Sequence, residues 1–147
     1  MKLNKKTILI IACTGFLFAF NIQKSFGCSC IKPPPSKQLF KKAVAVFTGR
    51  VIELKSPFRF FKNYNDRTKV TINVDTIWKG TKKETITLST PKHRESCGVS
   101  FVKGNNYLIY AFGTESNLTV NQCGRVLQIG EATKDLAELG EGTVVKK

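Results

Sequence analysis

Two cysteines, Cys28 and Cys30, are separated by one residue and follow a segment that has the features of a secretory signal. Cysteine thiols can form disulfides, ligate metals or act as nucleophiles. If the chain is cut after Gly27, Cys28 becomes the first residue and carries a free α-amine beside its thiol. An α-amine loses its proton more readily than a lysine amine, so near neutral pH it can offer a lone pair to a metal ion. The chemistry open to this pattern therefore depends on a cut at this position.

The first 27 residues have the three parts of a signal peptide. Three lysines in MKLNKK precede an uncharged apolar run over residues 7–20, and a polar stretch then ends at the small residue Gly27. The run of 14 residues is shorter than the roughly 20 apolar residues that a membrane-spanning helix needs. The sequence therefore predicts a signal peptide over 1–27, one domain over 28–147 and a secreted, extracellular protein. An uncleaved membrane anchor is the alternative.

Four cysteines remain after residue 27, and an even number in an exported chain indicates disulfides. Cys28 and Cys30 are too close along the backbone to pair easily with each other. Each is therefore expected to pair with Cys97 or Cys123, and the spacing leaves both arrangements open. A zinc site made of all four thiolates is a competing hypothesis, but C-x-C differs from the usual C-x2–4-C spacing of zinc ligands.

The chain is strongly basic, with 24 Lys and Arg against 10 Asp and Glu and a formal net charge of +14. Four of the lysines lie in the first 27 residues, so the remaining domain would carry about +10. Such a charge attracts a secreted protein to anionic surfaces, which makes cell-wall and extracellular polymers candidate partners. Aromatic and basic residues interleave over 55–66, as in proteins that bind single-stranded nucleic acid. An exported location argues against that partner.

The sequence contains no recognisable catalytic constellation. His93 is the only histidine and lies in the polar stretch TPKHRESC, where an exposed loop side chain is expected. No G-x-S-x-G, H-E-x-x-H or phosphate-binding glycine loop occurs. The sequence therefore predicts that the protein is not an enzyme and needs no cofactor.

Hydrophobic periodicity predicts strands separated by turn residues. The clearest strand, over 68–80, alternates apolar and polar residues and slips near Thr76, which indicates a bulge. Gly49 lies inside a second strand, over 43–54, and indicates a bend or bulge there. Further strands are expected over 84–90, 98–101, 106–113 and 118–123, with a loose tail over 141–147.

Short helices are expected near both ends of the domain, over 36–43 with Ser36 as the N-cap and over 131–140 with Gly140 at the end. The pattern predicts an all-β fold with small helices, a five- or six-stranded antiparallel barrel with one helix near each end. An OB-type barrel fits this strand count, although periodicity alone does not choose it over an immunoglobulin-like sandwich.

Four stretches resemble the N-terminal, netrin-like domain of the tissue inhibitors of metalloproteinases. CSCIKPPPSKQLF resembles the opening C-x-C with its prolines and short helix, and INVDTIWKG resembles a strand that ends in aromatic-Lys-Gly. SCGVSFVKGNNYLIYAFG resembles the Cys-Gly-Val motif with the strand after it, and LTVNQC resembles the strand that carries the next cysteine. The resemblance implies a netrin-like OB-type barrel and a secreted inhibitor of zinc metalloproteases.

The resemblance also implies residue roles. It implies the disulfides Cys28–Cys97 and Cys30–Cys123, and it implies that the amine and carbonyl oxygen of Cys28 replace the water on the catalytic zinc of a target protease. Ser29 would enter the specificity pocket of the protease, and its small size favours broad specificity. The other inhibitory contacts would lie along the substrate cleft and beside Cys28, at Cys30, Ile31, Ser96, Cys97 and Gly98. After the signal is removed, no membrane contact is expected.

Two features depart from the family pattern. The family usually has another cysteine near the position of Phe40, and Glu95 places a charge near the expected contact surface. Two rival hypotheses stay open. One is a netrin-like module that binds anionic polymers without inhibiting a protease. The other is a lipoprotein anchored through Cys28, which Gly27 fits and Phe26 does not, and in which lipidation would block both the amine and the disulfide.

Overall fold

The computed structural model describes residues 28, 30, 34–58, 63 and 65–145. The predicted signal peptide, two of the predicted contact residues (Ser29 and Ile31) and the aromatic and basic residues 59–62 and 64 lie outside this part of the chain. Within the described part, no helix is long and apolar enough to cross a membrane.

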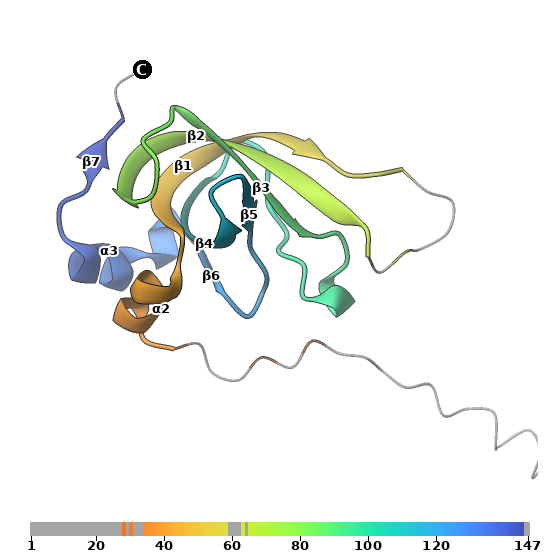
Figure 1. The fold of residues 1–147 in the computed structure, drawn as a ribbon, viewed down its shortest axis with the longest axis horizontal. Coiled ribbons are helices and arrows are strands. Elements are labelled where there is room, and N and C mark those ends of the chain that lie inside the picture. Colours follow the sequence, from red (N-terminus) through yellow and green to blue (C-terminus); the bar gives the residue numbers. More distant parts are fainter. Residues whose placement is uncertain (1–27, 29, 31–33, 59–62, 64, 146–147) are drawn as a thin grey trace, which may run out of the picture.

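Five strands close into a small barrel (Figure 1). They are β1 (Ala45–Lys55), β2 (Arg67–Lys79), β3 (Thr85–Pro91), β4 (Asn106–Thr114) and β5 (Asn117–Thr119). The strand order is β1-β2-β3-β5-β4, and β4 pairs back with β1 to close the ring. Two short strands extend it, β6 (Arg125–Gln128) beside β4 and β7 (Thr143–Val144) beside β2. The helices are α2 (Ser36–Lys42) and α3 (Thr133–Leu139), with 3-10 turns η1 (Arg94–Ser96) and η2 (Ile129–Glu131).

This barrel confirms the predicted all-β class, the OB-type strand count and a small helix near each end of the domain. The prediction that all strands pair antiparallel was wrong, because β3 and β5 are parallel. Geometry requires one such pair. A closed ring with an odd number of strands cannot alternate in direction at every step, so two neighbours must run the same way.

Strand β4 is buried on both of its faces, because one hydrophobic core fills the barrel and a second core covers the outside of this strand. Ile109 and Ala111 point into the barrel core with Phe47 of β1, whereas Leu108 and Tyr110 belong to the outer core. Helices α2 and α3 lie side by side over this outer face (Figure 1) and contribute Leu39, Leu136 and Leu139, together with Ala132 directly before α3. The two cores explain why the sequence of β4 is a continuous apolar run rather than an alternating one.

The irregularity expected in the first two strands lies where β1 crosses β2. Thr48 pairs with Thr76 and Gly49 with Val74, so Asp75 is the extra residue of a bulge on β2. A side chain on Gly49 would clash with the backbone oxygen of Asn73 and come within 2.7 Å of Ile72 Cγ2. Glycine at position 49 therefore permits the close approach of the two strands at the bulge.

Four local predictions were wrong. Residues 98–101 form no strand, because the amide of Val99 bonds to the hydroxyl of Thr90 and that of Val102 to the hydroxyl of Tyr107. Residues 118–123 are a strand only at their start, and β6 and β7 were not predicted. Ser36 begins α2 but does not cap it, since its hydroxyl bonds to Glu138. His93 is half-buried rather than exposed.

Candidate functional site

Two disulfides tie the segment that begins at Cys28 to the wall of the barrel. Cys28 is bonded to Cys97 across a sequence separation of 69 residues, with a Cα–Cα distance of 5.3 Å. Cys30 is bonded to Cys123 across 93 residues, with a Cα–Cα distance of 5.1 Å. This is the pairing that the family resemblance implies. It holds both ends of the tripeptide 28–30 against the domain.

The connection after β3 presents Cys97 in a tight turn. The amides of Ser96 and Gly98 both donate to the carbonyl oxygen of His93, at 3.1 and 3.0 Å, and the amide of Cys97 donates to that of Arg94. Cys97 itself has a left-handed backbone, with φ 64°. A Cβ on Gly98 would clash with the carbonyl oxygen of Pro91 and lie 2.8 Å from that of His93, so only glycine fits this position.

The two cystine bridges are neighbours. The carbonyl oxygen of Cys97 accepts a hydrogen bond of 2.7 Å from the amide of Gln122, which joins the β3–β4 connection to the one between β5 and β6. Cys28 Sγ lies 3.6 Å from Cys123 Sγ and 3.7 Å from Cys30 Sγ. We call the surface formed by residues 28, 30, 94–97 and 121–123 the cystine ridge.

The predicted contact residues differ in exposure. Cys30 is exposed, and Cys28, Ser96 and Cys97 are half-buried, so all four can contact a partner. Gly98 is buried, which limits it to shaping the turn beneath the ridge. Arg94 and Glu95 in η1 are both exposed, so the ridge carries one charge of each sign in addition to the predicted residues.

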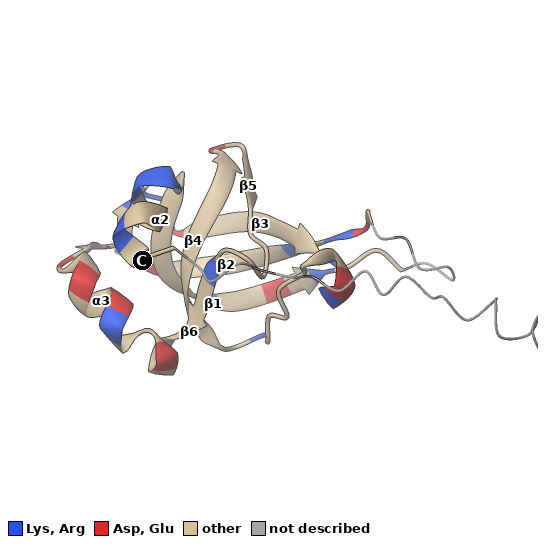
Figure 2. Ribbon diagram, turned by 90° about the horizontal axis from the view of Figure 1, so that it is seen from below, with Lys and Arg blue, Asp and Glu red and all other residues tan. Residues whose placement is uncertain are grey.

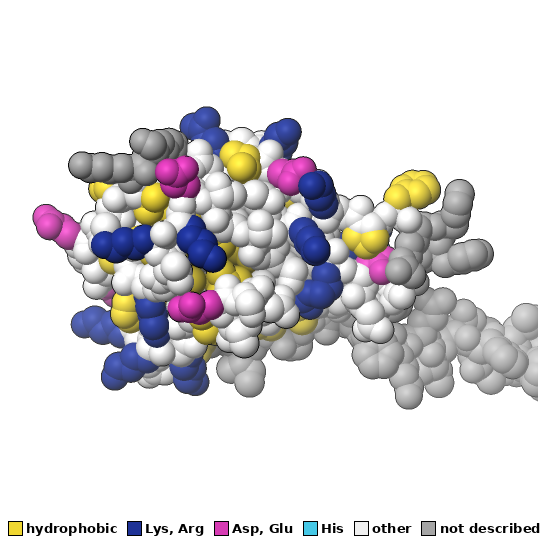
Figure 3. All heavy atoms as spheres, turned by 45° about the horizontal axis from the view of Figure 1, so that its top comes forward, with side chains coloured by type: hydrophobic (Ala, Val, Ile, Leu, Met, Phe, Trp, Pro, Cys, Tyr) yellow, Lys and Arg dark blue, Asp and Glu magenta, His cyan; other side chains and the backbone are white. Residues whose placement is uncertain are grey.

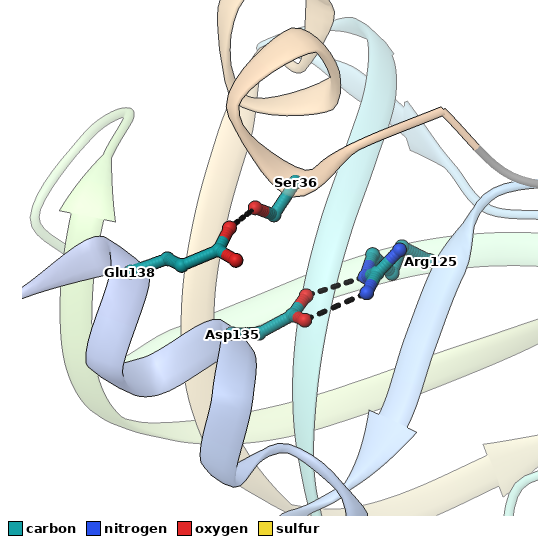
Figure 4. A network of polar contacts seen from close by, with 4 residues as sticks. All are labelled: Ser36, Arg125, Asp135 and Glu138. Atoms are coloured by element: carbon teal, nitrogen blue, oxygen red, sulfur yellow. Dashed lines mark hydrogen bonds and ion pairs between the residues drawn. The ribbon is translucent and has the colours of Figure 1, made fainter.

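A polar network joins β6 to the two helices (Figure 4). Arg125, two residues after Cys123, donates two hydrogen bonds to Asp135 of α3, from Nε to Oδ2 and from a terminal guanidinium nitrogen to Oδ1 at 2.7 Å. The side chain of Asp135 is only 3% exposed. Ser36 of α2 donates to Glu138, so α2, α3 and β6 are joined. The network lay outside the predicted site. Its one sequence signal is an acid on the apolar face of the helix that carries Ala132, Leu136 and Leu139.

The network also sets the electrostatics of the outer core. Hydrogen bonding to Asp135 raises the pKa of the Arg125 guanidinium, so this guanidinium stays protonated. Burial raises the pKa of the Tyr110 phenol, and the negative charge of Asp135 raises it further. Tyr110 is fully buried among the residues of the outer core.

The basic charge is distributed rather than gathered at the ridge. Helix α2 carries lysines, and α3 carries acidic as well as basic residues, as the colours of the two helices in Figure 2 show. On the face in Figure 3, Lys and Arg side chains surround a surface on which acidic and apolar side chains are also present. No single basic patch dominates these views.

The cysteine sulfurs are close enough together for a metal site, but they are oxidised to disulfides. The sulfurs of Cys28, Cys97 and Cys123 lie within 4.8 Å of one another. All are bonded in disulfides, which leaves no thiolate to act as a ligand. The disulfides indicate an oxidising compartment. No protein-family model matches the chain, and no curated protein is significantly similar to it.

Proposed function

We propose that the protein is a secreted, netrin-like inhibitor of zinc metalloproteases that acts through the N-terminus created at Cys28. The amine and carbonyl oxygen of Cys28 would occupy the open coordination position of the target's catalytic zinc and close a five-membered chelate. The observation that carries the proposal is the pair of disulfides that fasten Cys28 and Cys30 to the barrel.

The disulfides support the proposal energetically. A chain terminus is ordinarily loose, and ordering it on binding costs conformational entropy. Cys28 is already attached to a turn that is itself held by backbone hydrogen bonds. Most of that ordering cost is therefore met during folding, and more of the interaction energy remains for binding the protease.

The geometry of the ridge supports an extended contact. Cys30 in the first stretch of the ridge and Arg94 and Glu95 in the second are exposed. Ser96, next to the bridged Cys97, is half-buried. A substrate cleft that bound the amine of Cys28 could therefore contact two separate stretches of this chain. Secretion with removal of residues 1–27 is part of the proposal, because a preceding peptide would remove the amine.

The test is an inhibition titration with the chain that starts at Cys28 and with a variant that has one Ala before Cys28. A metzincin endopeptidase and thermolysin serve as targets. We expect inhibition by the native chain and a loss of at least about a hundredfold in the extended variant, since the amine is then an amide nitrogen. A variant with one Ala added after Lys147 is the control and should inhibit like the native chain. Equal inhibition by the chain extended before Cys28 would exclude the chelate mechanism.

A binding module for anionic polymers remains the alternative prediction. It requires binding that weakens strongly with salt and does not change when Ala is added before Cys28. The mixed charges of α2 and α3 do not favour it over the inhibitor proposal.

A further inference from the structure

A pocket of about 300 Å³ opens at the end of the barrel remote from the cystine ridge. It lies between the β2–β3 connection and the β4–β5 hairpin, near the start of β1. Val46, near the start of β1, pairs with Lys79 at the end of β2, whereas the ridge follows Pro91, which pairs with Arg67 at the start of β2. The two sites are therefore at opposite ends of the 13-residue strand β2.

The floor of the pocket is apolar. It is made by Val44, Ala45, Ile86 and Leu118, which also belong to or pack against the core inside the barrel. Ala45, Ile86 and Leu118 are each less than 8% exposed, so they form a fixed surface rather than mobile side chains. An apolar group placed on this floor would extend the core and gain roughly 25 cal/mol for each Å² of apolar surface that it buries.

The rim is polar and carries both charges. Lys83 comes from the β2–β3 connection and Glu115 from the β4–β5 hairpin, and both side chains are exposed. Neither has an ion pair with any other residue in the described part of the chain. The lining also includes the hydroxyl-bearing residues Thr81, Thr85 and Ser116. The pocket thus offers a cation, an anion and neutral hydrogen-bonding groups around one apolar surface.

We infer that this pocket binds a small zwitterion with an apolar side chain, namely a free α-amino acid of the size of leucine. The carboxylate would pair with Lys83, the ammonium with Glu115, and the side chain would rest on Ile86 and Leu118. The volume is at the lower end of the range for small-molecule sites, which suits a ligand of this size. A sugar fits less well, because none of the described residues that line the pocket is aromatic and could stack on its ring.

The inference is independent of the protease proposal, and the experiment keeps the two apart. The chain starting at Cys28 is labelled with ¹⁵N and titrated with L-leucine while the amide spectrum is recorded. We expect saturable shifts at the amides of Lys83, Ile86, Glu115 and Leu118 and none at the cystine ridge. The variant with Ala before Cys28 should bind leucine equally well, whatever its effect on inhibition.

Two analogues and three variants test the charge recognition. 4-Methylpentanoate lacks the ammonium and 3-methylbutylamine lacks the carboxylate, so each should bind at least about tenfold more weakly than leucine. Lys83→Gln and Glu115→Gln should each weaken leucine binding by a similar factor. Lys82→Gln is the control, because Lys82 is an exposed neighbour that does not line the pocket. The amide spectrum of each variant reports whether it is folded. Absence of shifts at the pocket, or equal binding of leucine and both analogues, would overturn the inference.

Discussion

Cys28 and Cys97 are separated by 69 residues in the sequence, and a disulfide places their Cα atoms 5.3 Å apart. The bond joins the predicted N-terminus of the mature chain to the turn between β3 and β4. Its position gives it two separable effects, one on the stability of the domain and one on the order of the terminus.

Replacing both Cys28 and Cys97 by Ser should lower the free energy of unfolding by about 4 kcal/mol, the chain-entropy value for a loop of this length. Denaturant unfolding measures this loss. The double variant Cys30→Ser/Cys123→Ser is the matched control, because it removes a bridge of similar span, 93 residues, and leaves Cys28 attached. Inhibition should suffer more in the first variant than in the second. A larger loss of inhibition in the second would mean that the Cys28 bridge does not order the inhibitory terminus.

Gly98→Ala should destabilise the domain by more than about 2 kcal/mol. The added Cβ meets two backbone carbonyl oxygens, those of Pro91 and His93, which cannot move without breaking the turn. Gly130→Ala is the control, since a Cβ there has open space and should change the stability by less than about 0.5 kcal/mol. Thermal or denaturant unfolding of the two variants makes the comparison, and similar stability in both would contradict the described turn.

Asp135→Asn should cost about 2–3 kcal/mol, because it leaves the half-buried guanidinium of Arg125 without its anionic partner. Glu131→Gln removes an exposed acid just before the same helix and should have almost no effect. Chemical unfolding provides the measurement. If the two variants were equally stable, the pair between β6 and α3 would not hold the helix to the barrel.

The raised pKa of the Tyr110 phenol leads us to expect that the protein loses stability in alkaline solution. Its pKa in the folded protein is raised above the ordinary value of 10.0, chiefly by burial. Above about pH 10 the unfolded chain therefore releases this proton while the folded chain retains it, and the stability falls as the pH rises. Below about pH 10 the phenol is protonated in both states, so its full contribution to the stability of the fold is present.

Tyr110→Phe should remove this part of the pH dependence. Unfolding at pH 8 and pH 11 should show a smaller loss of stability on alkalinisation for the variant than for the native chain. Lysine titration affects both proteins alike and cancels in the difference. The same slope in both proteins would show that Tyr110 ionises normally in the fold.

Much of the barrel could be predicted from the sequence, because its long strands have a local signal. The strand at β2 alternates apolar and polar residues and slips near Thr76, as a bulge at Asp75 requires. Other features depend on contacts between distant segments. Residues 98–101 are apolar enough for a strand, but the amide of Val99 bonds to the hydroxyl of Thr90, and that of Val102, just after them, bonds to the hydroxyl of Tyr107.

The two sites differed in how far they could be predicted. The C-x-C motif predicted the ridge. Only four cysteines follow residue 27, so Cys28 and Cys30 each had only two candidate partners, Cys97 and Cys123. The pocket was not predicted, because its lining comes from three separate stretches, none of which has a motif of its own. Lys83 and Glu115 are ordinary surface charges in the sequence, and only the closure of the barrel brings them to one rim.

The most direct test of the inhibitor proposal is the visible absorption spectrum of a cobalt-substituted target. The panel of targets is the metzincin endopeptidase and thermolysin, and the enzyme that is inhibited more strongly is used. Coordination by the Cys28 amine changes the ligands of the metal, so addition of the chain starting at Cys28 should change the cobalt bands with the same midpoint as inhibition. The variant with Ala before Cys28 should leave the bands unaltered. Inhibition without any change in the cobalt spectrum, or no inhibition of any enzyme in the panel, would contradict zinc chelation by Cys28.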